Sequence, residues 1–325
     1  MIALWDTTGN EVVRALSAER RNAGGVASGL ALTLVTVVDE DRVREAEAAA
    51  ATAAAAHPCR LLIVVRNPEA APGSKNPESR LDAEIVVGGR LGPAEAVVMR
   101  MHGRLTLHAE SVVVPLLAPD VPVVTWWHGP PPDRIATDAL GVVAERRITD
   151  VAQTSDPIAA LGQRAEDYAP GDTDLAWTRT TPWRTLLAGS LDTAAAAVSA
   201  VSVTADPDDP TGALLRGWLQ SRLRLQPTAR AEGPAIRAVD LKLANGEEIS
   251  LHCENGMATL HRSGLPDRVL PLPRRQLGDQ LAEELRRLDA DQPYASALQA
   301  ATGVTGISDR PGARVHVWYD PAGAS

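Results

Sequence analysis

His252, Cys253 and His261 could supply three ligands to a zinc ion, because imidazole nitrogens and a thiolate are ligands that zinc prefers. A hairpin would bring these positions near one another. Neighbouring residues on a strand point to opposite faces, however, and a fourth ligand is missing from the pattern. We therefore expect no metal site.

Cys59 follows His57-Pro58 at the start of an apolar segment. A nearby imidazolium would lower the pKa of the thiol and make it reactive. The apolar context favours the alternative, in which Cys59 is a small buried residue.

His108, Glu110 and Ser111 directly precede an apolar run that extends from Val112 to Leu117. One interpretation is a helix cap, in which the serine and glutamate side chains satisfy free backbone N–H groups. The other is a carboxylate and an imidazole at the rim of a pocket. We favour the cap and keep the pocket as the alternative.

Sequence motifs that mark known chemistry are absent. The chain has no G-x-x-x-x-G-K-[ST] phosphate loop, no G-x-S-x-G nucleophile motif, no H-E-x-x-H and no C-x-x-C. The glycine cluster from Gly24 to Gly29 lacks the G-x-G-x-x-G spacing of dinucleotide-binding loops. We expect no catalytic residues and no cofactor.

The charge balance limits the classes of partner. The chain has 325 residues and a net charge of −9, which argues against nucleic acid and anionic membranes as partners. The two cysteines suit a reducing compartment, and neither a signal peptide nor an apolar segment of about 20 residues is found. These features predict a cytoplasmic protein.

Because phenylalanine is absent, alanine, valine and leucine must fill most of the core.

The first half of the chain has an α/β pattern. Leu30 to Val38 and Cys59 to Val65 have strand composition, and the alanine-rich segment Val43 to Ala56 between them predicts a helix. This order is a βαβ unit. Two further strands, Asp82 to Val87 and Glu95 to Gly103, are joined by a connection so short that they must pair antiparallel, so the sheet is mixed.

The stretch from His108 to Gly129 supplies the inner strand of this sheet. Val123 to Trp127 reads as a strand covered on both faces. Since neighbours on a strand point apart, Trp126 and Trp127 cannot enter the same pocket. We expect one of them in the core and the other against a groove or a partner. A short helix is predicted from Asp133 to Leu140.

The second half predicts a smaller α+β domain. The acidic and Pro/Gly-containing segment from Ala169 to Asp174 marks the boundary, so we assign residues 1–170 to the first domain and residues 171–325 to the second. Asn245-Gly246 predicts a hairpin, and Met257 to His261 extends it to a three-stranded antiparallel meander. Arg274 to Leu288 predicts an amphipathic helix, and Arg314 to Tyr319 an edge strand or a tail.

Five segments carry a resemblance to a known protein family, in the same order and with similar spacing along the chain. They are HPCR from His57, HAES from His108 leading to VVTWW from Val123, RITD from Arg147, DLAWTRTTPWR from Asp174, and GWL from Gly217. Together they resemble the glucose-6-phosphate dehydrogenase assembly protein family, OpcA. The alanine- and arginine-rich composition is similar to its actinobacterial members.

The resemblance implies a non-catalytic assembly factor or allosteric activator that binds glucose-6-phosphate dehydrogenase in the oxidative pentose phosphate pathway. Tryptophan and arginine are the residue types that carry most binding energy at interfaces. We therefore take six residues as candidates for contact with the partner, with interdomain packing as the equal alternative for the last four. They are Trp126, Trp127, Trp177, Arg179, Trp183 and Arg184.

A second hypothesis is a sugar-phosphate-binding enzyme or a metabolite sensor. Its pocket would lie near His108, Glu110 and Trp126, at the carboxyl end of the sheet, where open α/β folds bind ligands. In this hypothesis, and as an effector in the first one, the ligand is a sugar phosphate.

Overall fold

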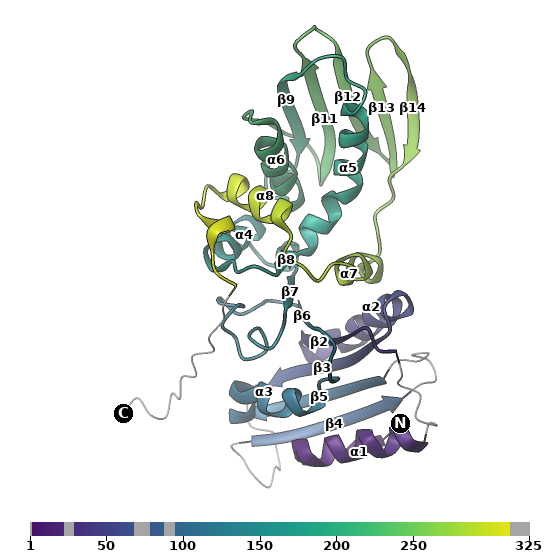
Figure 1. Cartoon of the computed structure of the whole chain (residues 1–325), viewed down its shortest axis with the longest axis vertical. Coiled ribbons are helices and arrows are strands. Elements are labelled where there is room, and N and C mark those ends of the chain that lie inside the picture. Colours follow the sequence, from purple (N-terminus) through teal and green to yellow (C-terminus); the bar gives the residue numbers. More distant parts are fainter. Residues whose placement is uncertain (1, 23–28, 68–78, 88–94, 313–325) are drawn as a thin grey trace. The chain divides into compact units, whose positions relative to one another are not determined.

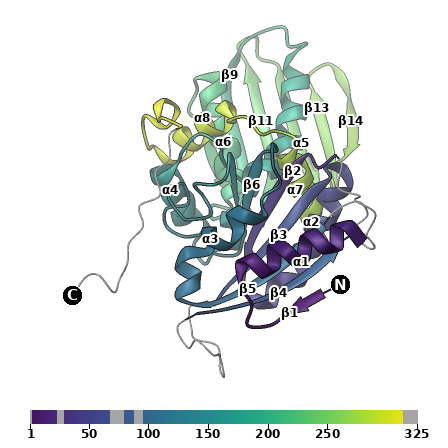
Figure 2. The same ribbon diagram turned by 60° about the horizontal axis from the view of Figure 1, so that its bottom comes forward.

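The computed structural model of the chain describes residues 2–22, 29–67, 79–87 and 95–312 (Figures 1 and 2). The chain forms two compact units. The first comprises Met1–Thr149 and Leu277–Ala290, and the second comprises Asp150–Gln276 and Asp291–Pro311. The chain therefore leaves the first unit, builds most of the second, and returns to complete the first with one helix. Among the helices of these described ranges, none has the length and hydropathy of a membrane-spanning segment.

The first unit is built on a mixed sheet with the strand order β1-β4-β5-β3-β2-β6-β7. Its strands are β1 (Ile2–Leu4), β2 (Leu32–Val38), β3 (Cys59–Asn67), β4 (Ser79–Val87), β5 (Glu95–Gly103), β6 (Val123–His128) and β7 (Arg146–Thr149). The five strands from β5 to β7 in this order are parallel, whereas β4 pairs antiparallel with β5 and β1 antiparallel with β4. The predicted mixed sheet and the antiparallel pair are confirmed.

Strand β2 lies at the centre of this sheet. Its residues pair with β3 on one side and β6 on the other, so that Thr36 is opposite both Ile63 and Trp126. Leu34 and Val35 are fully buried although they point to opposite faces. A central parallel strand is covered on both sides in this way, which is why its sequence is an almost unbroken β-branched and aliphatic run.

The first unit also contains helices and short 3-10 turns. They are α1 (Gly9–Asn22), η1 (Glu40–Arg42), α2 (Val43–Ala56), η3 (Arg104–His108), α3 (Ala109–Val113), η4 (Val114–Leu116) and α7 (Leu277–Leu285). Helix α7 packs closely on α2, since a Cβ atom added to Gly278 would lie 2.5 Å from Cβ of Thr52. The guanidinium of Arg146 also bonds to the carboxylate of Glu284 on α7, and both side chains are buried. These contacts fasten the returning helix to the first unit.

The second unit contains an antiparallel meander with two helices on one face (Figure 1). Its sheet has the order β10-β9-β11-β12-β13-β14, and the four strands from β11 to β14 are consecutive antiparallel neighbours. The strands of this sheet are β9 (Val198–Ala205), β10 (Thr228–Ala231), β11 (Ile236–Leu243), β12 (Glu248–Glu254), β13 (Met257–Arg262) and β14 (Leu265–Pro271). The second unit also contains the short strand β8 (Asp172–Asp174), which is not part of this sheet. The predicted α+β fold and its Asn245-Gly246 hairpin are confirmed, and the meander has one strand more than the three expected.

The helices of the second unit pack on that sheet and on one another. They are η5 (Val151–Gln153), α4 (Pro157–Asp167), α5 (Leu175–Leu191), α6 (Pro210–Leu223), α8 (Gln292–Thr302) and η6 (Ile307–Asp309). Trp183 and Leu187 of α5 and Leu215 of α6 share one hydrophobic cluster with sheet residues such as Val203 and Leu251.

Two predicted helices differ from the structure. Residues 133–140 form turns and bends, because Asp138 turns its carboxylate back to the N–H of Leu140 and to Arg66, and because Gly141 approaches the carbonyl of Ile135 too closely for any side chain. The helix predicted from Arg274 to Leu288 is shorter, as α7 begins at Leu277 and ends at Leu285. The segment from Arg314 to Tyr319 lies outside the described residues.

Replacement of Gly217 by alanine tests the packing of α6 against α8. The new Cβ would lie 2.2 Å from the carbonyl oxygen of Ala297 and 2.9 Å from the amide nitrogen of Ala301. Because both are backbone atoms, the helices must separate, and we expect Gly217→Ala to lower the free energy of unfolding by about 2–3 kcal/mol. Gly189→Ala is the matched control: it lies on α5 with nothing within 4 Å and should raise stability by roughly 0.5–1 kcal/mol. Urea unfolding measures both, and equal effects would contradict the close packing.

Candidate functional site

The first sheet has a topological switch point between β2 and β6, since β3 and β5 lie on one side of β2 whereas β6 and β7 lie on the other. Open α/β sheets usually bind ligands at this point, outside the carboxyl ends of the strands. A cavity of about 210 Å³ lies there, lined by residues that include Val38, Asp39, Trp127, Gly129 and Pro131. The switch point therefore has the position of a ligand site in this fold.

Arg66 and His128, which also line this cavity, each lie against a carboxylate. Arg66 donates two hydrogen bonds of 3.0 Å to Asp138, and the buried His128 lies 3.0 Å from a carboxylate oxygen of Glu45. Asp138 thus neutralises the charge of Arg66, which an anionic ligand in the cavity would otherwise use.

The segment Asp39-Glu40-Asp41 occupies the turn between β2 and α2. In dinucleotide-binding sheets this turn is rich in glycine, and the helix that follows holds the pyrophosphate with its N-terminal N–H groups. Here three exposed carboxyl side chains stand at that position, and the carboxylate of Glu40 accepts hydrogen bonds from Arg100 at 2.8 and 2.9 Å. Carboxylates repel phosphate, so the geometry disfavours a nucleotide at the switch point.

Trp126 and Trp127 are both buried, with exposed fractions of 0% and 1%. The ring of Trp126 lies 4.8 Å from the ring of His128, whereas Trp127 points to the opposite face and lines the switch-point cavity. One tryptophan thus belongs to the core and the other borders a cavity, as the strand alternation predicts.

His108, Glu110 and Ser111 do not cap a helix. The hydroxyl of Ser111 donates to the carbonyl of His108, and no side chain of the helix start accepts a backbone N–H. The cap interpretation is wrong because η3 runs directly into α3, so that no free helix N-terminus exists at this point. Nδ1 of His108 lies 3.7 Å from a carboxylate oxygen of Glu110, and Ser111 lines a groove next to α1. A binding role for the three residues stays a prediction.

Helix α5 carries the other four predicted contact residues, and its first turn is fixed by Asp174, which accepts the N–H of Ala176. Trp177 is buried and donates from Nε1 to Asp291 at 2.8 Å, while the guanidinium of Arg184 lies 3.7 Å above its ring. Trp183 is buried in the cluster beneath the second sheet. In the described structure the indoles of these tryptophans are interior groups, and the two arginines are half-buried.

Arg179 binds Asp150 through two hydrogen bonds of 2.8 and 2.6 Å, and the carboxylate of Asp150 is only 2% exposed. Burial alone would lower the pKa of Arg179, but the hydrogen bonds and the charge of Asp150 outweigh it, so that the pKa is raised. This ion pair joins α5 to the residues that open the second unit.

The two cysteines and the histidines of the meander give no reactive centre. Burial raises the pKa of the Cys59 thiol to about 12, and the pKa of Cys253 is raised in the same direction. His252 pairs with Asp240 and His261 pairs with Asp267. Within the described ranges, no three His, Cys, Asp or Glu side chains are grouped as a metal site would require.

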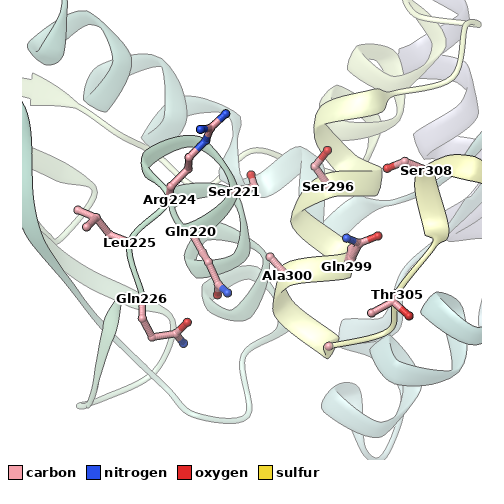
Figure 3. Close-up of a pocket in the computed structure, with 11 residues that line it drawn as sticks. Gln220, Ser221, Arg224, Leu225, Gln226, Ser296, Gln299, Ala300, Thr305 and Ser308 are labelled. Atoms are coloured by element: carbon pink, nitrogen blue, oxygen red, sulfur yellow. The ribbon is translucent and has the colours of Figure 1, made fainter.

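A larger cavity of about 660 Å³ lies in the second unit between the C-terminal parts of α6 and α8 (Figure 3). The sequence did not point to it, because its walls come from segments about 75 residues apart. Several of its polar side chains already bond to their own backbone. Ser221 donates to Trp218, Ser296 donates to Gln292, and Gln299 accepts from Ile307. Ser221 and Ser296 are thereby held on their own helices, and Gln299 is bonded to the first residue of η6.

Two sequence models of one family match the chain. The glucose-6-phosphate dehydrogenase subunit N-terminal domain matches residues 50–166, and the C-terminal domain of the same subunit matches residues 170–298. The two ranges follow one another and together take in well over half of the chain. The chain belongs to the OpcA family of glucose-6-phosphate dehydrogenase subunits. This family supplies non-catalytic assembly subunits that bind the dehydrogenase, the enzyme at the entry of the pentose phosphate pathway.

Among solved structures, the chain is similar to UDP-N-acetylglucosamine 3-dehydrogenase from Acidithiobacillus ferrooxidans, with 13% identity, a TM-score of 0.37, and coverage of 83% of this chain and 96% of that one. An oxidoreductase from Sinorhizobium meliloti shows 11% identity, a TM-score of 0.42, and coverage of 87% and 99%. At these values the likeness carries no argument about activity. Comparison with curated proteins gives no match.

Replacement of Arg179 by methionine tests the ion pair beneath α5. The change leaves the carboxylate of Asp150 buried without its charged partner, and we expect the free energy of unfolding to fall by about 3 kcal/mol. Asp150→Asn in the same background removes the stranded charge and should restore much of the loss. Chemical denaturation of both variants measures this, and an unchanged midpoint for Arg179→Met would show that the pair is not stabilising.

Thiol alkylation tests the assignment of the cysteines. Because a pKa of about 12 leaves almost no thiolate at pH 8, Cys59 should stay unlabelled by iodoacetamide in the native protein, and Cys253 should react slowly. After unfolding in urea both thiols should react fully. Mass spectrometry of the peptides provides the readout, and fast native labelling of Cys59 would refute its burial.

Proposed function

We propose that this chain activates glucose-6-phosphate dehydrogenase allosterically, by binding the active conformation of the enzyme more tightly than its other conformations. The match to both domains of the dehydrogenase subunit family carries this proposal. The acidic turn Asp39-Glu40-Asp41 supports it, because the place where a related sheet would bind a nucleotide is adapted against phosphate.

The energy that such activation requires is small. A subunit shifts the conformational equilibrium of its partner only by the difference between its affinities for the two conformations. A tenfold shift corresponds to about 1.4 kcal/mol, which is within reach of one well-buried side chain at an interface. No catalytic group of the subunit is needed.

The proposal also covers the type of family member, the cellular compartment and the domain boundary. We place the chain in the actinobacterial type of the family on its alanine- and arginine-rich composition, and in the cytoplasm on the nature of its partner. We further propose that residues 1–170 and 171–325 are its two evolutionary domains. The family models support this boundary, because one ends at residue 166 and the next begins at residue 170.

We also propose that the partner is contacted through four tryptophans, on the condition that binding changes their surroundings. They are Trp126, Trp127, Trp177 and Trp183. All four are buried in the free chain, so they would have to become exposed on binding or act by shaping the surface above them. Arg179 and Arg184 are half-buried and can be reached without any change of fold.

Mixing the purified chain with its dehydrogenase tests the proposal. We expect the two proteins to co-migrate in size-exclusion chromatography, and the dehydrogenase to gain activity with a midpoint that follows the binding curve. The chain alone should show no turnover of pentose-phosphate intermediates.

The sensor hypothesis is tested with the chain alone in a thermal-shift series with sugar phosphates. A concentration-dependent rise of the midpoint would favour a metabolite site. Absence of both co-migration and rate change in the mixture would exclude the activator.

A further inference from the structure

The cavity of about 660 Å³ in the second unit has the size of a small-molecule site, since such sites commonly measure about 300–1,000 Å³. Its walls come from the end of α6 and the segment after it, from α8, and from the chain between Gly303 and η6 (Figure 3). The two helices pack closely at Gly217, where an added Cβ would lie 2.2 Å from the carbonyl oxygen of Ala297. The cavity begins one turn beyond this contact, at Gln220 and Ser221, so the helix packing fixes its position.

Several polar side chains of these walls form no hydrogen bond or ion pair with any other residue of the described structure. They are Gln220, Arg224, Gln226, Thr305 and Ser308. An amide or a hydroxyl group both donates and accepts hydrogen bonds, and a guanidinium donates through a planar fork that matches an oxyanion. The cavity can therefore bind the hydroxyl groups and an anionic group of a ligand without breaking a bond that the fold needs.

Arg224 lies at the C-cap of α6 with a φ of 56°, in the left-handed region that residues with a side chain adopt only at an energetic cost. Helix α8 ends at the same cavity with the same kind of cap, but there the residue is Gly303, with a φ of 78°. Glycine forms this cap without strain. Since the guanidinium of Arg224 bonds to no described residue, the fold itself gives no reason for an arginine at this position. A ligand in the cavity would give one.

The lining residues define the chemistry of such a ligand. Among the described residues that line the cavity, Arg224 is the one charged side chain and none is aromatic. The cavity thus has a partner for one anionic group and no ring on which a nucleobase could stack. Helices α6 and α8 both end there, and their last carbonyl groups carry partial negative charge. These carbonyls accept hydroxyl groups and repel a second anionic group.

We propose that this cavity binds a small polyhydroxylated molecule that carries one carboxylate or phosphate group. Arg224 holds the anionic group, and the amides and hydroxyls of the walls hold the hydroxyl groups. The wall formed by α6 lies within residues 170–298, the range that the C-terminal domain of the subunit family matches. The inference goes beyond the proposed function, because an activator needs no small-molecule ligand of its own. It concerns a cavity distinct from the one at the switch point, whose wall includes the carboxylate of Asp39.

Four related probes test the chemistry of the ligand in isothermal titrations of the full chain. D-gluconate carries a carboxylate and sorbitol 6-phosphate a phosphate on the same length of polyol, whereas sorbitol lacks the anionic group and acetate lacks the polyol. We expect gluconate, sorbitol 6-phosphate or both to bind. Sorbitol and acetate should bind about tenfold more weakly or not at all, because each loses one of the two kinds of contact.

Replacement of Arg224 tests the location of the site. Arg224→Gln removes the positive charge and should weaken binding of the anionic polyol by about tenfold or more. Arg222→Gln is the matched control, because Arg222 is exposed on the same helix and does not line the cavity. It should bind like the wild type. Arg224→Gly should also lose binding, yet raise the thermal midpoint of the ligand-free chain by about 2 °C, because glycine relieves the left-handed backbone.

Four outcomes would contradict the inference, and each has its own meaning. If the wild type binds neither anionic polyol, the cavity has no such ligand, while the activator proposal stands because co-migration with the dehydrogenase does not depend on it. An equal loss of binding in Arg222→Gln and Arg224→Gln would reveal a general effect of charge. Binding that survives both replacements of Arg224 would place the ligand in another cavity. Acetate that binds as tightly as the anionic polyols would reduce the site to one for a bare anion.

Discussion

The first unit depends on one constraint, which is that β2 must be covered on both faces while it pairs with a strand on each side. Leu34 and Val35 point to the two faces of the sheet and are both fully buried, although the chain contains no phenylalanine to cover them. Small aliphatic and alanine side chains let α2 lie close above the sheet, and Gly278 lets α7 lie close on α2. Packing at such short range leaves little room for cavities except where the strands end.

The end of β2 is also where this sheet differs from one that binds a nucleotide. Asp39, Glu40 and Asp41 follow Val38 directly, so the position that would hold a phosphate carries negative charge. The fold thus keeps the architecture of a ligand-binding sheet with an electrostatic field of the wrong sign for that ligand.

Local sequence patterns predicted the elements whose causes are local. The βαβ unit from β2 to β3 and the hairpin at Asn245-Gly246 follow from periodicity and turn chemistry, and both were found. The helix predicted over residues 133–140 does not form, because the carboxylate of Asp138 binds the guanidinium of Arg66, which lies 72 residues away in the sequence. The burial of Trp177 depends in part on Asp291, 114 residues further on.

The return of the chain to the first unit has a consequence for biosynthesis. Helix α2 leaves the ribosome early, yet the helix that packs against it, α7, begins only at residue 277. More than two hundred residues must be synthesised before the alanine-rich side of α2 receives its cover. The nascent N-terminal portion therefore waits with apolar surface open to water, a period in which folding factors have access to it and in which premature termination leaves an incomplete globule.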